Sequence, residues 1–391
     1  MSKKKGASRK AKSLRAGRRS RSLCGIAGAA AVLGIMVYFL VISPGKSKID
    51  LTGAPSYNVL LITLDTTRAD HLGCYGYKPA KTPNLDRLAR EGVRFARTYC
   101  PAPLTLPAHA SIMTGLYPVV HAVRNNGHYL PSGIRTLAEI LKGKGYSTAA
   151  FVSSFSVDSR FGLDRGFDVY DDTFQSESPF KTQNAERRAE ETFARFSRWL
   201  ENNGKNRFFG WVHYYDPHVP YDPPSPYKEE FDGDPYDGEI AYMDQYVGAV
   251  LERLKEKGIL ERTIVVIAGD HGEGLGDKVE LGHGIFLYEE TLRVPLILYS
   301  HAVFPRSQLI ESQVRLIDVA PTILETIGLK NEAAGMAGQS LIAWLRGKSQ
   351  KDLDSLVETF YPRENFGWSE LADWFRGAGN IFSPRGPSFM T

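Results

Sequence analysis

Cysteine is scarce in this sequence. Cys24, Cys74 and Cys100 are the only three cysteines in 391 residues, which excludes a small secreted module held together by disulfides. Cys74 and Cys100 could still form one disulfide, but a chain with 42% hydrophobic residues can bury a core that does not depend on it. The composition is that of a globular protein with one large domain or two ordinary ones.

Beyond the first 22 residues, basic residues are fewer than acidic residues. Residues 1–22 hold ten of the 48 lysines and arginines and no acidic residue, which leaves 38 basic against 44 acidic residues in the remainder. The net charge of +4 therefore conceals a mildly acidic body. Because a nucleic-acid-binding face needs basic residues spread over a folded surface, we expect no nucleic-acid partner.

A run of 21 uncharged residues, Leu23 to Ser43, follows the basic tail. As a helix it would be roughly 31 Å long, about the thickness of a hydrocarbon core. The run ends in bulky residues and lacks a small-residue cleavage site, which favours an uncleaved anchor over a signal peptide. With the tail at 1–22 in the cytoplasm, a transmembrane helix at 23–43 and a linker at 44–56 would place the rest outside the cytoplasm, in the periplasm of a Gram-negative cell.

Beyond residue 56, apolar runs of strand length alternate with helical patterns. Strands that are apolar throughout and separated by helices indicate a mostly parallel central sheet with helices on both faces. The sequence therefore predicts an α/β domain. The predicted strands are 58–64, 93–99, 147–152, 207–214, 262–268 and 294–300, and the longest predicted helices are 185–202 and 236–257.

Residue types that bind metals follow three of these predicted strands. They are Asp65, the pair Asp270 and His271, and the group His213, Asp216 and His218. The carboxyl ends of parallel strands meet at one edge of a sheet, where ligands bind. A single carboxylate at a strand end is often only a helix cap or a turn former, but three strands that end this way indicate one common site.

The segment 270–284 adds five glycines and a further histidine, His283. The glycines would let backbone and side chains approach one centre, whereas the simpler interpretation is a solvated surface loop. Carboxylate and imidazole ligands together suit zinc or manganese, whereas calcium prefers oxygen ligands throughout. We predict a site for one or two divalent ions, with zinc as the first choice and manganese or calcium as alternatives.

Thr105 lies where a helix is predicted to begin, because Pro107 fits the first turn of a helix. The unpaired N–H groups and the dipole at the amino end of a helix favour a bound anion. A divalent ion beside the Thr105 hydroxyl would lower its pKa and make an alkoxide available near neutral pH. Thr105 is therefore a candidate nucleophile, and its simpler role is that of a helix cap.

These motifs together resemble those of the sulfatase family in the alkaline phosphatase superfamily. The resemblance covers residues 57–330 and rests on "NVLLITLDTTRAD", "PLTLPAHASIMTGLYP", "YDPHVPY" and "AGDHGEGLGDKVELGHG". It implies an alkaline phosphatase-like fold and a metal held by Asp65, Asp270 and His271, with a metal-bound nucleophile at Thr105. It also implies that residues 331–391 form an abbreviated, partial C-terminal subdomain with a tail.

The chain departs from sulfatases in the strict sense at the nucleophile. Their C-x-P-x-R motif, whose cysteine becomes formylglycine, is replaced here by Thr105, Pro107 and His109, and threonine cannot become formylglycine. The pattern T-x-P-x-H is similar to that of nucleotide pyrophosphatase/phosphodiesterases. That similarity implies that Asn126, which lies 21 residues after Thr105, contacts an oxygen of the transferred group.

A second similarity, to phosphoethanolamine transferases, concerns His283, which lies twelve residues after His271. It implies that His283, with His218, binds a second metal or contacts the transferred group. His213 and Asp216 are alternatives to His218 in this role. The remaining histidines of this region, His109, His121 and His128, are expected to be structural.

These features predict a membrane-anchored, metal-dependent hydrolase that acts on phosphate or sulfate esters through a covalent ester of Thr105. Phosphorus is favoured over sulfur because the formylglycine route is closed. One alternative is a phosphoethanolamine-type transferase that acts on an envelope lipid or glycan. Another is a catalytically inactive, anchored binding protein. The predicted substrate is an ester of a small molecule, a lipid or a glycan.

Overall fold

The computed structural model describes residue 49 and residues 56–174 and 186–367. These residues belong to one compact unit, Lys48–Thr391. In the described part of the chain, no helix has the length and apolar character that crossing a membrane requires. The transmembrane helix predicted at 23–43 lies outside the described residues.

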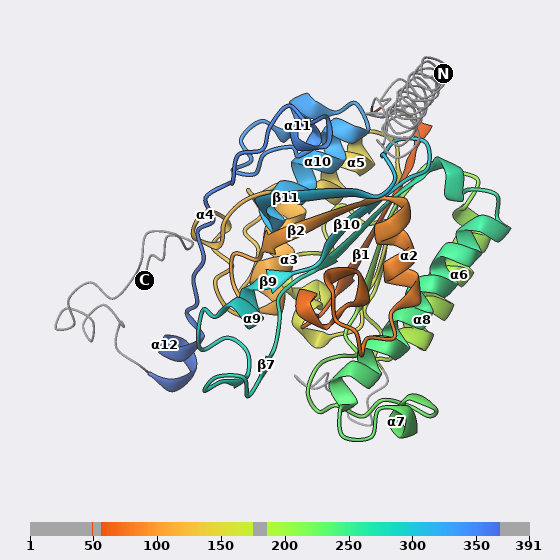
Figure 1. Ribbon diagram of the computed structural model, residues 1–391. Helices are drawn as coiled ribbons and strands as arrows, with labels where there is room; N and C mark the ends of the chain where they lie inside the picture. Colours follow the sequence, from red (N-terminus) through yellow and green to blue (C-terminus); the bar gives the residue numbers. More distant parts are fainter. Residues whose placement is uncertain (1–48, 50–55, 175–185, 368–391) are drawn as a thin grey trace, which may run out of the picture. The chain divides into compact units, whose positions relative to one another are not determined.

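A large, mostly parallel sheet forms the centre of the described structure (Figure 1). Its strand order is β11-β2-β10-β6-β1-β5-β3-β4, with the short β9 paired to β2. The central strand β1 (Asn58–Leu64) pairs in parallel with β5 on one side and β6 on the other. The predicted α/β fold with a mostly parallel sheet is confirmed.

The strand bounds agree closely with the sequence pattern. Besides β1, the strands are β2 (Val93–Tyr99), β3 (Ser147–Phe151), β4 (Val169–Asp171), β5 (Phe208–Tyr214), β6 (Thr263–Gly269), β9 (Arg293–Val294), β10 (Leu296–Tyr299) and β11 (Gln308–Arg315), and β7 (Gly274–Leu275) pairs with β8 (Leu281–Gly282) in a separate two-stranded sheet.

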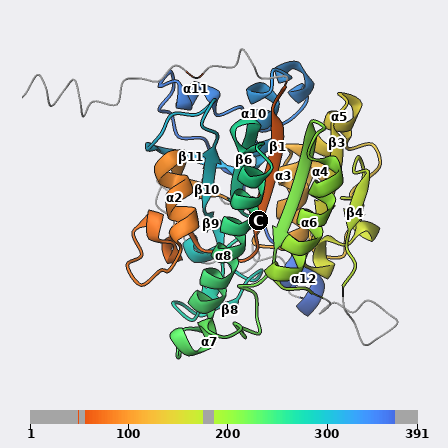
Figure 2. The same cartoon turned by 90° about the vertical axis from the view of Figure 1, so that its right-hand side faces the viewer.

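Helices cover both faces of the large sheet because successive side chains of a strand point to opposite sides. Val59 and Leu61 of β1 pack in a core that includes α3 (Thr105–Thr114), α5 (Leu137–Gly143) and α10 (Val319–Thr326). Leu60 and Ile62 pack in the opposite core, with α2 (Pro83–Glu91), α6 (Ala189–Asn203) and α8 (Pro235–Glu256). Figure 2 shows α6 and α8 on the near side of the sheet and α10 behind it.

The shorter helices lie in the connections. They are α4 (Pro118–His121), α7 (Tyr227–Glu230), α9 (Glu289–Leu292), α11 (Ile342–Leu345) and α12 (Tyr361–Phe366). Cys74 and Cys100 are free thiols, so the disulfide that they could have formed is not made. The boundary predicted at residue 330 between the main domain and a C-terminal subdomain stays a prediction.

Two features of the half of the sheet that holds β11, β2 and β10 differ from the pattern expected from the sequence. The predicted strand 294–300 is divided into β9 and β10 at Pro295, which has no N–H to donate within a sheet. Both pieces run antiparallel to β2. The edge strand β11 was not expected, because its sequence, QLIESQVR, mixes polar with apolar residues. Two of its residues, Leu309 and Glu311, are exposed.

Candidate active site

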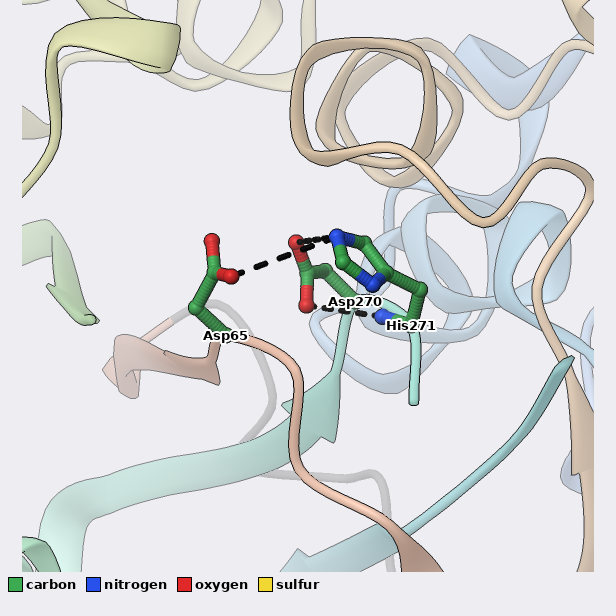
Figure 3. Close-up of side chains that lie close together, drawn as sticks. All are labelled: Asp65, Asp270 and His271. Carbon is green, nitrogen blue, oxygen red and sulfur yellow. Dashed lines mark hydrogen bonds and ion pairs between the residues drawn. The ribbon is translucent and has the colours of Figure 1, made fainter. Parts of the chain in front are cut away.

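The candidate site lies at the carboxyl ends of β1 and β6, which are neighbours in the sheet. Leu64 of β1 pairs with Gly269 of β6, so the residues that follow them, Asp65 and Asp270, leave the sheet side by side. His271 comes next after Asp270. The side chains of Asp65, Asp270 and His271 point toward one another (Figure 3). The parallel register of two strands therefore creates the cluster that the strand-end residues predict.

The three side chains have the geometry of a metal site. One ligand atom from each of Asp65, Asp270 and His271 lies within 4.8 Å of the others, and all three side chains are buried. Among the described residues, this is the one group of carboxylates, imidazoles and thiols that meets this condition. His271 Nε2 lies 3.5 Å from Asp270 Oδ2 and 3.9 Å from Asp65 Oδ1.

The hydrogen bonds leave the right atoms available for a cation. Asp65 Oδ1 and Asp270 Oδ2 are buried and have no hydrogen-bond partner. His271 Nδ1 donates to the carbonyl oxygen of Gly272 at 2.9 Å, so Nε2 keeps its lone pair toward the two carboxylates. Buried carboxylate oxygens without partners are rare in proteins, and the donor set of two carboxylates and one imidazole fits a divalent ion such as zinc or manganese.

Burial shapes the electrostatics of the cluster. It raises the pKa of Asp65 to about 8 and the pKa of Asp270 well above its usual value, because the protein interior disfavours the charged carboxylates. Burial likewise lowers the pKa of His271 far below its usual value, so this ring is neutral. Two carboxyl groups and one neutral imidazole form a site in which a cation would supply the missing positive charge.

The chain around Asp65 is held in a strained turn. Thr66 has a φ of 46°, which is unusual for a β-branched residue. Its N–H donates to Asp270 Oδ1 at 3.2 Å, and its carbonyl accepts the Tyr236 hydroxyl at 2.7 Å. His213 Nε2, at the end of β5, lies 3.2 Å from Asp65 Oδ2. The surrounding contacts therefore fix the direction of the Asp65 carboxylate.

Thr105 is the first residue of the fully buried helix α3. Its Oγ1 lies 3.4 Å from His271 Nε2, which brings the hydroxyl to the edge of the carboxylate cluster. The N-cap position of this helix is occupied by Leu104 and not by Thr105, and no side chain caps the helix there. The simpler role of a helix cap therefore does not account for Thr105. His109 Nδ1 donates to the Thr105 carbonyl at 2.7 Å and lies 3.5 Å from Asp270 Oδ2, which ties the first turn of α3 to the site.

Asn126 lies beside the amino end of α3. Its Oδ1 accepts the backbone N–H of Leu106 at 3.0 Å. The carbonyl end of this amide is thus committed to the helix, and its NH₂ end is left as the donor. The role implied for Asn126, which is to contact an oxygen of the transferred group, stays a prediction.

His283 lies beside His271, and His218 lies beside His283. The ring of His283 is centred 4.3 Å from the ring of His271 and 5.2 Å from that of His218. His283 Nδ1 donates to Glu273 Oε1 at 3.0 Å. Burial lowers the pKa of His283, but the carboxylates of Glu273, Asp65 and Asp270 together outweigh burial and raise that pKa to about 9.

Other residues weighed from the sequence have different positions. Asp216 Oδ1 accepts the N–H of Ala189, the first residue of α6, and therefore caps that helix. His121 bonds Ser111, and His128 bonds Glu364. The structure thus gathers Asp65, Thr105, Asn126, His218, Asp270, His271 and His283 in one region.

Two residues of this region were not assigned to the site from the sequence, or were given only as alternatives. Glu273 is fully buried and bonds His283, although it lies in a glycine-rich segment whose simpler interpretation is a solvated loop. Its only signal was its place two residues after His271. His213 appeared as one of three polar residues at the end of β5, and only the pairing of β5 with β1 brings it to Asp65.

The fold and the site together define the class of alkaline phosphatase-like hydrolases. Among solved structures, the phosphonate monoester hydrolase of Agrobacterium radiobacter has the same fold, with a TM-score of 0.66 at 22% identity, and the match covers 80% of this chain and 83% of that one. The phosphonate monoester hydrolase of Silicibacter pomeroyi gives a TM-score of 0.64 at 23% identity over 80% and 83% of the two chains.

The chain belongs to the sulfatase family, whose model matches residues 57–329. An ulvan-active sulfatase of Formosa agariphila is 27% identical over 354 residues, which are 78% of this chain and 68% of that protein. The multifunctional alkaline phosphatase superfamily protein PehA of Trinickia caryophylli is 27% identical over 74% of this chain and 77% of that protein. The protein is therefore a sulfatase-family enzyme that hydrolyses esters, and the predicted family is confirmed.

Proposed function

We propose that the protein is a metal-dependent hydrolase of phosphate or sulfate esters that works through a covalent ester of Thr105. The observation that carries this proposal is the position of the Thr105 hydroxyl, 3.4 Å from His271 Nε2 and beside two buried carboxylates with unpartnered oxygens. An N-terminal anchor at 23–43 and an extracytoplasmic, in Gram-negative cells periplasmic, location are part of the same proposal.

Asp65, Asp270 and His271 would hold the ion, with zinc as the first choice. When bound there, a divalent ion supplies the positive charge that lowers the pKa of a neighbouring hydroxyl and neutralises an anionic substrate. Asn126 and the amino end of α3 would receive the non-bridging oxygens of the substrate. His283 and His218 lie next to His271 and would bind the substrate or the leaving group.

In the first half of the reaction, Thr105 Oγ1 forms a bond to phosphorus or sulfur while the bond to the leaving alcohol oxygen breaks. The Thr105 hydroxyl releases its proton as it attacks, and the leaving oxygen takes up a proton from His283, whose pKa of about 9 keeps its ring protonated near neutral pH. In the second half, a water oxygen forms a bond to the phosphorus or sulfur, the bond to Thr105 Oγ1 breaks, and a water proton restores the hydroxyl as the phosphorus or sulfur oxyanion leaves. We propose phosphorus esters as the preferred substrates because the chain lacks the cysteine from which formylglycine is made. The ulvan-active and phosphonate-ester-hydrolysing relatives support both a glycan ester and a small-molecule ester as substrates.

The test compares the full chain with Thr105→Ala and Thr105→Ser on p-nitrophenyl esters of phosphate, phosphonate and sulfate, with and without zinc. We expect turnover that depends on zinc, is abolished in Thr105→Ala and is partly kept in Thr105→Ser, whose hydroxyl is retained. Full activity of Thr105→Ala would refute the nucleophile. Release of a single equivalent of p-nitrophenol, with turnover only after a glycan or lipid acceptor is added, would instead support the phosphoethanolamine-type transferase. No release from any ester would support an inactive binding protein.

A further inference from the structure

The described C-terminal segment, residues 352–367, runs from the edge strand β11 to the active site. We call it the strap. At its start, the Leu353 N–H donates to the carbonyl of Gln313 in β11 at 3.0 Å. Further along, the Glu358 N–H donates to the carbonyl of Pro101 at 2.9 Å, and the Thr359 hydroxyl donates to the carbonyl of Gly284. Figure 1 shows that the strap ends in α12, at the same end of the large sheet as α9 and β7.

The strap is fastened to the turn that carries Asn126. Arg124 forms a two-bond ion pair with the mostly buried Glu358, at 2.6 and 2.7 Å. The Arg124 guanidinium also lies 3.7 Å from the centre of the Phe360 ring. A bidentate pair of this kind fixes orientation as well as distance, so it holds Arg124 and the strap in one relative orientation.

The next residue, Asn125, depends on α12 for its hydrogen bonds. Asn125 is 5% exposed. Its Oδ1 accepts the N–H of Asn126 at 2.9 Å, and its Nδ2 donates to Glu364 Oε2 at 2.7 Å and to Asn365 Oδ1 at 3.1 Å. Both acceptors of this buried NH₂ group therefore come from the strap. Losing an acceptor leaves a buried donor unpaired, which costs more than a typical hydrogen bond contributes.

These contacts form a continuous path from α12 to the nucleophile. Glu364 holds the Asn125 side chain, the Asn125 side chain holds the Asn126 backbone, and Asn126 Oδ1 accepts the Leu106 N–H at the start of α3. Leu106 directly follows Thr105. We propose that Glu364 is a positioning residue, through which the strap sets the direction of the Asn126 amide toward the transferred group. This inference rests on the proposed function of Asn126.

The kinetic test uses Glu364→Ala, Glu364→Gln, Asn126→Ala and the double variant, with Glu332→Gln as the matched control. Glu332 forms surface ion pairs with Arg135 and Lys144, away from the strap. We expect Glu364→Ala to lower kcat/KM about tenfold, as loss of a supporting partner typically does, with zinc affinity unchanged. Glu364→Gln should keep most of the activity, because its amide oxygen accepts the same bond. In the Asn126→Ala background, Glu364→Ala should cause no further loss.

A second readout does not need activity. If Glu364 acts through Asn125 and Asn126, hydrogen exchange at the Leu106 amide should be faster in Glu364→Ala than in Glu332→Gln. Unchanged exchange at Leu106, or a tenfold loss that persists in the Asn126→Ala background, would overturn the inference. These outcomes are separate from failure of the proposed function, which Thr105→Ala decides.

Discussion

The substitution Asp65→Asn should stabilise the fold when no divalent ion is bound and destabilise it when an ion is bound. Without an ion, Asp65 is a fully buried carboxyl group with one oxygen unpartnered and a pKa of about 8, against an ordinary value of 3.8. Because the folded-state pKa lies above the unfolded-state value, its stabilising contribution is complete below about pH 4 and is lost as the pH rises toward 8. At pH 7 this loss amounts to roughly 4 kcal/mol, which a neutral Asn side chain avoids.

With zinc present, the wild type should become more stable than the Asp65→Asn variant. An ion that binds only the folded wild-type protein adds about 7 kcal/mol when its free concentration is a hundred thousand times its Kd, which exceeds the roughly 4 kcal/mol lost without the ion. Asp65→Asn removes one of the three ligand groups and should lose most of this gain. The Asn NH₂ group can also donate to Asp270 Oδ2, which has no partner in the wild type, so the variant is well accommodated only when the ion is absent.

The assay is urea unfolding of both proteins from pH 5 to 8, in a chelator and in zinc. We expect the variant to be more stable than the wild type in the chelator at pH 7, with a gap that narrows toward pH 5. In zinc, the wild type should be the more stable of the two. A variant that is less stable in the chelator at pH 7, or equal stabilisation of both proteins by zinc, would refute the reasoning about this site.

Two further predictions concern the loop 270–284. Glu273→Gln should lower kcat/KM about tenfold and leave zinc affinity unchanged, because the charged partner that orients His283 is lost. Steady-state kinetics and zinc titration measure these two quantities. An unchanged kcat/KM would contradict the prediction. Gly272→Ala should destabilise the fold by about 3 kcal/mol, because a Cβ there would lie 1.9 Å from the carbonyl oxygen of Glu290. The control in urea unfolding is Gly133→Ala, because a Cβ at Gly133 would have no atom within 4 Å. Equal stability of the two variants would contradict the prediction, because it would mean that the loop shifts to accommodate the Cβ at residue 272.

Much of the scaffold could be predicted from the sequence because it depends on local patterns. Apolar runs of strand length located β1 and β2 to the residue, and the residue that follows each parallel strand necessarily emerges at the same edge of the sheet. Asp65, Asp270 and His271 were therefore identifiable as one cluster. Pro107 likewise marked the first turn of α3, and so the place of Thr105.

Other features depend on contacts between residues far apart in the chain, for which the sequence carries no local signal. The antiparallel direction of β10 is visible only in its pairing with β2 and β6. Glu273 became a buried partner of His283 only when the loop folded back on itself. The bond between Asn125 and Glu364 joins residues 239 positions apart. The sequence alone determined which groups follow the central parallel strands, because the bounds of those strands follow from the local apolar pattern, whereas only the tertiary structure decided which distant side chains support them.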